Sequence, residues 1–581
     1  MVGPLYDCLA NPLGAVRLTF EKAMASVSDP SAFDVRDWGV FEVFRNFLLE
    51  QDNLSKVPML NPLTVRWVQP NTLVRFRGMI QDMLGNEFYV GAFKDESIWR
   101  TNKFVDVSQF PMPPSPDMRI WERRLLYCVT VPGLNTWAES ATESAVNGHM
   151  ESMSEQRDKR SIMDIVSSNG FEDFPNAKRM KEDGQPSPSS ESRDSKTEDS
   201  FSGTIQLPQG DRSSFPCLVK IYNSPESDLK LNEVFEFIGV LTFDPELTME
   251  GKDDNDECYD AIYIHLPPNK VPRLHCIIHR KLAVDDFLHN PFQVEPKPHL
   301  VKDVRQALLK HLTAISCNDA LAAHFILLHL LSRVHTRIDG VAVGKLSLNI
   351  TCLNKDNSTL FGSQIHTAIQ NLLPFTNRIP LTLEYLNKDS FASRKDYGTN
   401  RLIPGVLQLA EGSHLIIDET QLEAGTLSSI GVENVRLLKD LIELQKVEYD
   451  FKYYKMEMAT DVQLMVLSEG KSNIMPADIV MPFRPSLINS SEVVATGGLQ
   501  AWRWYLATVR TLSHTIDSEM QKVVENDLVA LRQADRSLGG QDFNRLLTMG
   551  RLISASFGEA SLSMEHWQMV KELERLRKER L

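Results

Sequence analysis

The spacing of apolar residues predicts two amphipathic helices near the start of the chain. Val16, Phe20 and Met24 recur every four residues, which places them on one face of a helix. A second stretch with helical spacing contains Val40, Phe41, Phe44, Phe47 and Leu48. The sequence therefore predicts two helices in this part of the chain.

Apolar and β-branched residues then gather in short runs that predict strands. The runs span residues 73–80, 88–93, 125–131, 217–222 and 234–241. A turn at Gly85-Asn86 is expected between the first two runs. Gly78 and Gly239 lie within runs and suit the bends of a small closed barrel. We therefore predict one OB-like β domain, with a long insertion between its third and fourth strands.

The segment 139–214 is dense in Ser, Glu, Asp, Gly and Lys and is predicted to be a disordered acidic insertion. Ser187-Pro188 is a candidate proline-directed phosphorylation site, where added charge would tune a contact. Two basic clusters fit a bipartite nuclear import signal, although such clusters are also common in linkers. They contain Arg157, Lys159, Arg160, Lys178, Arg179 and Lys181.

The second half of the chain changes from strand patterns to helical and mixed patterns. Helical spacing runs from Val301 to Leu331, and strands then alternate with helices to about Pro485, as in an α/β sandwich. The last part is helical and ends in a run of paired charges, Glu572 to Arg580. The predicted fold class is α/β multidomain, with five segments. They are the helices and first OB-like part at 1–138, the insertion at 139–214, the rest of the OB-like domain at 215–300, the α/β core at 301–498 and a helical lid at 499–581.

An acidic pair, Asp418-Glu419, follows the apolar residues 415–417 and has the form of a Walker B motif. A strand that ends in solvated acids is the simpler alternative. A working ATPase also needs a Gly-rich turn ending in Gly-Lys-Ser/Thr, whose N–H groups hold phosphate. The turn expected at 353–362 lacks that sequence, and Gly344-Lys345 precedes its strand instead of following it. We therefore predict no cofactor and no catalytic residue, with Asn473 as a relic of a polar sensor position.

Metal binding is not favoured by the histidine and cysteine pattern. His265, His275, Cys276 and His279 lie close in sequence, but apolar residues alternate around them as in strands. Core and surface histidines are the better interpretation. The acidic loop 253–257 lacks the glycine and terminal glutamate of a calcium loop. No metal site is predicted.

The charge balance favours protein partners. The chain of 581 residues has 62 Lys and Arg against 77 Asp and Glu, a net charge of -15. Arg75 and Arg77 share one face of a strand and could face nucleic acid, but a solvent-exposed face is preferred. The seven cysteines are scattered, which indicates a reduced compartment, and an acidic residue near the N-terminus does not fit a secretory signal. The apolar stretches are too short for a membrane span, so we predict a soluble intracellular protein.

Several long strings in the chain resemble the mini-chromosome maintenance complex-binding protein family. They are Leu126-Tyr127-Cys128-Val129-Thr130-Val131-Pro132-Gly133, Val271-Pro272-Arg273-Leu274-His275, Gly344-Lys345-Leu346-Ser347-Leu348-Asn349, Ser554-Ala555-Ser556-Phe557-Gly558-Glu559 and the C-terminal stretch 573–581. The resemblance covers nearly the whole chain.

The resemblance implies a nuclear, non-enzymatic protein that binds subunits of the MCM replicative helicase complex. Such proteins support assembly, stability or unloading of that complex in DNA replication and sister-chromatid cohesion, and so act in the cell cycle, cell division and mitosis. Their implied plan is an OB-type region, a degenerate AAA+-like core and a helical lid, in which Arg545 takes the position of a lid arginine. Chromatin association would then occur through partners, without direct nucleic-acid binding.

Two alternatives remain open. One is a divergent ATPase that uses Asp418 and Glu419 with Lys345 or Lys355. The other is a single-stranded DNA binder that uses Arg75 and Arg77.

Overall fold

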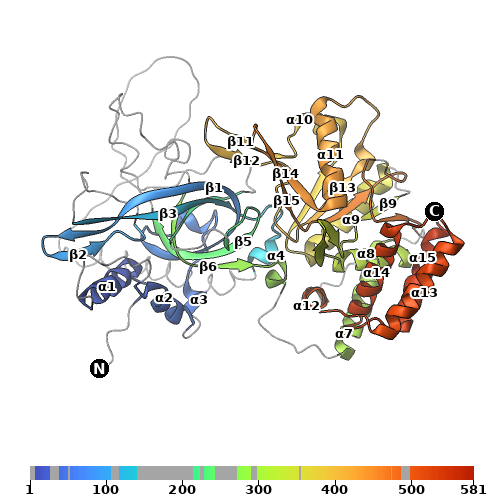
Figure 1. Cartoon of the computed structure of the whole chain (residues 1–581), viewed down its shortest axis with the longest axis horizontal. Coiled ribbons are helices and arrows are strands. Elements are labelled where there is room, and N and C mark those ends of the chain that lie inside the picture. The colour runs from blue at the N-terminus through green and yellow to red at the C-terminus, as the bar shows by residue number, and fades with distance from the viewer. Residues whose placement is uncertain are drawn as a thin grey trace, which may run out of the picture.

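The computed structural model describes residues 7–26, 38–49, 53–105, 117–140, 214–222, 228–242, 271–288, 298–351, 355–472, 474–485 and 498–581. Figure 1 shows a closed β-sheet at one end of the molecule and a parallel sheet with helices at the other. Several predicted features lie outside the described residues. They are most of the insertion, the clusters Arg157, Lys159, Arg160 and Lys178, Arg179, Lys181, then Ser187, the loop Asp253–Glu257, His265 and Asn473.

The two predicted N-terminal helices are confirmed and pack on the closed sheet. They are α1 (Pro12–Ala25) and α2 (Val40–Leu49), followed by the short α3 (Asn53–Lys56) and η2 (Thr64–Arg66). Phe20 and Phe44 are buried in one cluster with Leu73 of the first strand. Phe41, in contrast, is 40% exposed, because it lies beside the buried stripe of α2.

Six strands form the first sheet, which closes on itself. They are β1 (Thr72–Asp95), β2 (Ile98–Thr101), β3 (Met118–Val129), β4 (Pro216–Ile221), β5 (Val234–Thr242) and β6 (Arg273–Leu282). The order is β2-β1-β3-β4-β6-β5, and β1 also pairs with β5, which completes the ring. β4 and β6 are parallel, whereas the other pairs are antiparallel. Phe76, Phe237 and Leu274 fill the interior.

The predicted turn at Gly85-Asn86 is wrong. β1 continues through both residues for 24 residues, and Asn86 pairs with Arg124 of β3. Gly85 has a φ of 92° and lies at a register shift between Met83 and Gly85, so it forms a bulge. The glycine that was expected in a turn therefore bends one long strand.

The parallel sheet has five strands in the order β10-β13-β16-β9-β17. Its strands are β9 (Leu348–Thr351), β10 (Thr376–Pro380), β13 (His414–Asp418), β16 (Gln463–Leu467) and β17 (Ile479–Pro482), and every neighbouring pair is parallel. The helices around it are α7 (Pro298–Ile315), α8 (Ala320–Leu331), α9 (Lys355–Leu372), α10 (Leu383–Lys388) and α11 (Ser429–Leu444). The alternation of strands and helices agrees with the predicted α/β core.

A second, smaller sheet lies between the closed sheet and the parallel sheet (Figure 1). Its strands are β11 (Ser393–Asp396), β12 (Arg401–Ile403), β14 (Lys446–Asp450) and β15 (Lys455–Ala459), in the order β12-β11-β14-β15. A separate hairpin is formed by β7 (Thr336–Ile338) and β8 (Val341–Val343). The remaining short elements are α4 (Thr136–Ser140), η5 (Val284–Phe287) and η6 (Glu419–Gln421).

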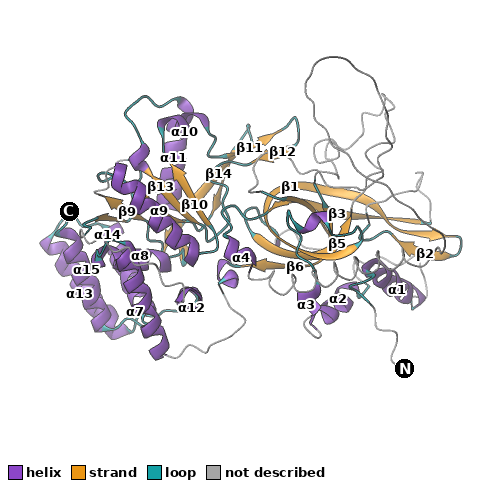
Figure 2. Ribbon diagram, turned by 180° about the vertical axis from the view of Figure 1, so that it is seen from behind, coloured by secondary structure: helices purple, strands orange, loops and turns teal. Residues whose placement is uncertain are grey.

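The C-terminal segment is helical, as predicted, and packs beside α7 and α8 (Figure 2). It contains α12 (Leu499–Arg510), α13 (Ser518–Ala534), α14 (Gly540–Ser556) and α15 (Met564–Lys578). The predicted charge pairing near the C-terminus is confirmed. Arg577 binds Glu574 at 2.7 Å, and Arg580 reaches the buried Asp319 at 2.7 Å. Among the described segments, no helix combines the length and the apolar character needed to cross a membrane.

Specific polar contacts connect the closed sheet to the rest of the molecule. The carboxylate of Asp82 in β1 accepts the Leu402 N–H at 2.7 Å. The Tyr449 hydroxyl donates to Asn232 at 2.9 Å, and both residues are buried. Gly133 has a φ of 72°, and a Cβ there would lie 2.5 Å from the Thr376 carbonyl oxygen. The backbones of the two parts therefore meet in direct contact.

Candidate functional site at the carboxyl end of the parallel sheet

The acidic pair lies at the carboxyl end of the parallel sheet, where ligands usually bind in open α/β folds. Asp418 is the last residue of β13, and Glu419 begins η6. Hydrophobic residues 415–417 are fully buried, so the strand carries Asp418 into the interior with only 1% of its surface exposed. The alternative of a strand that ends in solvated acids is therefore wrong for Asp418. Its charge needs a partner inside the protein.

That partner is Arg378, which projects from the neighbouring strand β10. Arg378 Nη2 donates to Asp418 Oδ2 at 2.8 Å. Asp418 Oδ1 accepts from the hydroxyl and the N–H of Thr420, at 2.6 and 3.2 Å. A Cβ on Gly362 of α9 would lie 3.2 Å from Arg378 Nη2, so this glycine leaves room for the guanidinium. A fixed side-chain cation thus occupies the carboxylate that a Walker B aspartate would offer to magnesium.

Glu419 is partly buried beside Asp418. Burial raises its pKa, and a hydrogen bond with Ser472 partly counters the shift. Its Oε2 is buried and has no hydrogen-bond partner among the residues that the structure describes. Asn349 of β9 lies in the same network, because it donates to Ser468 at 2.6 Å and accepts the Ser472 N–H at 3.3 Å. The strand ends are therefore connected to one another by their own side chains.

The connection from β9 into α9 differs from the predicted turn. We expected a turn from 353 to 362, but α9 begins at Lys355 and includes Gly362. Without glycines to open the chain, the helix begins soon after the strand. Lys345 lies at the opposite end of β9, where its ammonium binds Asp478 at 2.8 Å. Its assignment to a turn before the strand is confirmed.

Arg545 also lies away from the acidic pair. It binds Asp542 and Glu574, each at 3.0 Å, and its Nη1 lies 3.4 Å from the Asp478 carbonyl oxygen. Asp478 precedes β17, so this arginine contacts the amino end of the sheet, whereas Asp418 closes the carboxyl end. The arginine that the resemblance places in the lid therefore lies at the opposite end of the sheet from Asp418.

Arg75 and Arg77 do not form a solvent-exposed face, so that prediction is wrong for β1. Arg75 is only 7% exposed and binds Glu236 of β5 at 2.7 Å. Arg77 binds the same carboxylate oxygen at 2.9 Å. Burial acts to raise the Glu236 pKa, but the two arginines outweigh it and lower the pKa to about 2. One buried acid therefore holds the two cations that the DNA-binding alternative required.

The histidine and cysteine cluster is part of the closed sheet. His275 is fully buried in β6 with its Nδ1 2.6 Å from the Tyr222 hydroxyl, and Cys276 points into the core. Burial lowers the His279 pKa. Within the described ranges, no three His, Cys, Asp or Glu side chains are grouped to hold a metal ion.

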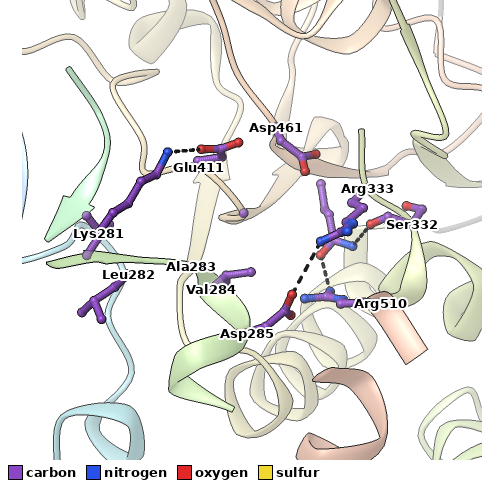
Figure 3. A pocket seen from close by; sticks show the side chains of 13 residues that line it. Lys281, Leu282, Ala283, Val284, Asp285, Ser332, Arg333, Glu411, Asp461 and Arg510 are labelled. Atoms are coloured by element: carbon purple, nitrogen blue, oxygen red, sulfur yellow. Dashed lines mark hydrogen bonds and ion pairs between the residues drawn. The ribbon is translucent and has the colours of Figure 1, made fainter. Parts of the chain in front are cut away.

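A cavity lies at the other end of the parallel sheet. It has a volume of about 230 Å³ and is lined by Lys281 of β6, Asp285 of η5, Arg333, Asp461 and Arg510 of α12, among others. Figure 3 shows the Asp285, Arg333 and Arg510 side chains converging on one side, with Lys281 and Glu411 opposite. Burial raises the Asp461 pKa to about 6. Charges of both signs balance in this cavity, so it does not select an anion such as a nucleotide phosphate.

Sequence reasoning found the acidic pair but missed the residues that complete it. These are Arg378, Asn349 and Ser472. A signal was present for Arg378, because it lies within the short run 376–380 next to a buried strand, where a charge needs a partner. Asn349 in the middle of an apolar strand carries a similar signal. Ser472 has none, because only the loop geometry brings it to Glu419.

Comparison with known proteins identifies the family. A family model described as "Mini-chromosome maintenance replisome factor" matches residues 44–581. The "Mini-chromosome maintenance complex-binding protein" of Arabidopsis thaliana is 56% identical over 595 residues, covering 100% of both chains. The proteins of the same name are 34% identical in Homo sapiens and 33% identical in Gallus gallus, covering 99% of this chain and 98% of each relative. The chain therefore belongs to the mini-chromosome maintenance complex-binding protein family.

Proposed function

We propose that this chain is a non-catalytic nuclear factor that binds the MCM replicative helicase complex. In this proposal it supports assembly, stability or unloading of the complex in DNA replication and sister-chromatid cohesion. Family membership supports the choice of partner, because its relatives are named for binding that complex. The ion pair between Arg378 and Asp418 supports the absence of catalysis, and it is the observation on which the proposal most depends.

The strand order of the parallel sheet supports a degenerate AAA+-like core. Numbered by their order in the chain, β9, β10, β13, β16 and β17 are the first to the fifth strands of this sheet. Across the sheet, starting from β17, they lie in the order fifth, first, fourth, third and second. This is the order of the AAA+ ATPase core, with the acidic pair after the third strand. The proposed core thus resembles a helicase subunit in shape, while Arg378 takes the place of the metal. A surface of this kind could occupy the position of a true subunit at a ring interface.

The closed sheet supports an OB-like domain. Without β2, its ring runs first, second, third, fifth and fourth in chain order, and the third and fifth strands are parallel. That arrangement is typical of OB folds. We propose domain limits at 1–138, 139–214, 215–300, 301–498 and 499–581, with the last segment as a lid. Nuclear import through the basic clusters and modification at Ser187 belong to the same proposal.

The two alternatives are less well supported. A divergent ATPase would need Asp418 free for magnesium, but its oxygens accept from Arg378 and Thr420. A single-stranded DNA binder would need exposed cations and stacking aromatics, but Arg75 and Arg77 share Glu236. No membrane partner belongs to this proposal.

The test is co-elution with the purified MCM complex in size-exclusion chromatography. We expect the full-length protein to elute with one or more helicase subunits under conditions that keep their own complex intact. ATP turnover by the purified protein should stay at the level of a buffer control. If the protein elutes alone at micromolar concentrations, or if it hydrolyses ATP in a manner that Asp418→Asn abolishes, the proposal is wrong.

A further inference from the structure

The small sheet ends in the strand β15. Within the described part of the chain, β15 pairs with β14 and with no other strand. Four of its five residues are exposed, and Met458 is partly buried. Open edges of this kind can accept a further strand, and proteins usually protect them.

The backbone groups of β15 alternate between the sheet and the open side. The Phe451 N–H bonds to the Tyr454 carbonyl oxygen at 3.0 Å, and the Thr460 N–H bonds to the Gln445 carbonyl oxygen at 2.9 Å. Bonded and non-bonded pairs alternate along an antiparallel ladder. The register therefore directs the N–H and C=O groups of 455, 457 and 459 toward the open side.

One face of the strand continues the hydrophobic core beyond its edge. Met458 pairs with Val447 and Met456 pairs with Tyr449, and both partners are buried. Met456 is nevertheless 39% exposed, and Tyr454, which precedes the strand, is 59% exposed. An incoming strand with apolar residues on this face would cover both side chains.

The other face carries charges that are already paired within the chain. Lys455 binds Glu433 at 2.6 Å and Glu448 at 2.9 Å. Glu457 binds Lys446 at 2.8 Å. The edge thus has no excess of positive charge for a phosphate backbone, and the whole chain carries -15. A protein strand with alternating apolar and polar residues fits this edge better than nucleic acid does.

Exposed tyrosines at the end of the edge add an anchor for a protein partner. Tyr453 is 78% exposed and Tyr397 of the β11–β12 turn is 50% exposed. Their ring centroids are 5.7 Å apart, and the Tyr397 hydroxyl donates to the Phe451 carbonyl oxygen at 2.8 Å. The two turns are thereby held together. Tyrosines held in this way often carry much of the binding energy of an interface.

We propose that the open edge of β15 binds an extended strand of an MCM complex subunit. This inference depends on the proposed function, because it names the surface through which that partner binds. The bound strand pairs with the backbone of 455–459, buries Met456 and Tyr454 with its apolar face, and turns its polar face toward Lys455 and Glu457. β-strand addition is an established mode of peptide recognition.

The main test is Glu457→Pro in the full-length protein, measured by titration against purified MCM complex. Proline removes an N–H on the open side and leaves the ladder with β14 unbroken, because 457 does not bond across it. Glu457→Gln is the matched control, since it also loses the Lys446 ion pair but keeps the N–H. We expect Glu457→Pro to weaken binding about tenfold or more, and Glu457→Gln to stay within about twofold.

A second variant makes the test independent of backbone effects. Met456→Lys places a charge where the incoming apolar residue would pack, and should also weaken binding at least about tenfold. Thermal melts check that each variant is folded. If folded Met456→Lys binds the MCM complex with wild-type affinity, the proposal is wrong. If the wild type does not bind the MCM complex, the proposed function fails as well. If the wild type binds the complex and the variants lose only their self-association in sedimentation, the edge binds a second copy of this chain instead.

Discussion

Removal of Arg378 tests whether the acidic pair is held by an internal cation. In Arg378→Met the buried Asp418 carboxylate loses its 2.8 Å ion pair with Arg378, while both Thr420 bonds remain. Loss of one member of a buried ion pair costs about 3–5 kcal/mol. Arg378 is itself 27% exposed and Asp418 only 1%, so the group left behind is the one that water cannot reach. Because Thr420 still binds Asp418, we expect a loss near the lower limit, about 3 kcal/mol.

The assay is thermal unfolding followed by circular dichroism. For domains of 150–250 residues, each kcal/mol lowers the melting temperature by about 2–4 °C, so the shift should be about 6–12 °C. The double variant Arg378→Met with Asp418→Asn is the matched control, and should recover much of the loss because it removes the buried charge. An Arg378→Met protein that melts within about 1 °C of the wild type would refute the reasoning. Stabilisation of the wild type by magnesium and ATP would contradict it independently.

Three further predictions concern the closed sheet and its junction with the rest of the molecule. Burial acts to raise the Glu236 pKa, but Arg75 and Arg77 lower it from 4.5 to about 2, so its contribution to stability is present above pH 4.5 and is lost as the pH falls toward 2. Glu236→Gln should therefore reduce the loss of unfolding free energy with falling pH, as measured by urea titrations. An unchanged pH dependence in this variant would count against the prediction. Burial raises the Asp461 pKa from 3.8 to about 6, so between these pH values the folded protein keeps a proton that the unfolded chain releases, and stability falls as the pH rises. Asp461→Asn should remove this decrease of the unfolding free energy with pH. A wild type whose unfolding free energy does not fall over this interval would contradict the assignment. Asp82→Ala should cost about 1–3 kcal/mol, because the buried Leu402 N–H loses its acceptor, and melting curves should show this with the exposed Asp95→Ala as the control.

Local patterns predicted the elements well where periodicity alone determines them. The apolar spacing of Val16 and Phe20 located α1, and the run 415–417 located β13. Pattern failed at Gly85, because a glycine with positive φ serves a bulge as well as a hairpin and only the partner strand decides. It failed for Arg75 because Glu236, its partner, lies on a strand far away in sequence.

The candidate site was half predictable for the same reason. Asp418-Glu419 is a continuous motif, and the missing phosphate turn is visible in the sequence. The contact between Arg378 and Asp418 depends on β10 lying next to β13, which follows from the order of strands in the sheet. Sequence patterns report the period of an element but do not specify its neighbours.

The direct contacts between the closed sheet and the remainder have a consequence for how a large partner would be held. Asp82, Asn232 and Gly133 each lie at that junction, and fix the two parts before any partner arrives. A partner that touches both parts then gains its second contact at a high effective concentration, without the entropy loss of first ordering a hinge. The same rigidity also selects partners by geometry. A partner whose two contact surfaces have a different spacing can contact only one of the two parts of this chain.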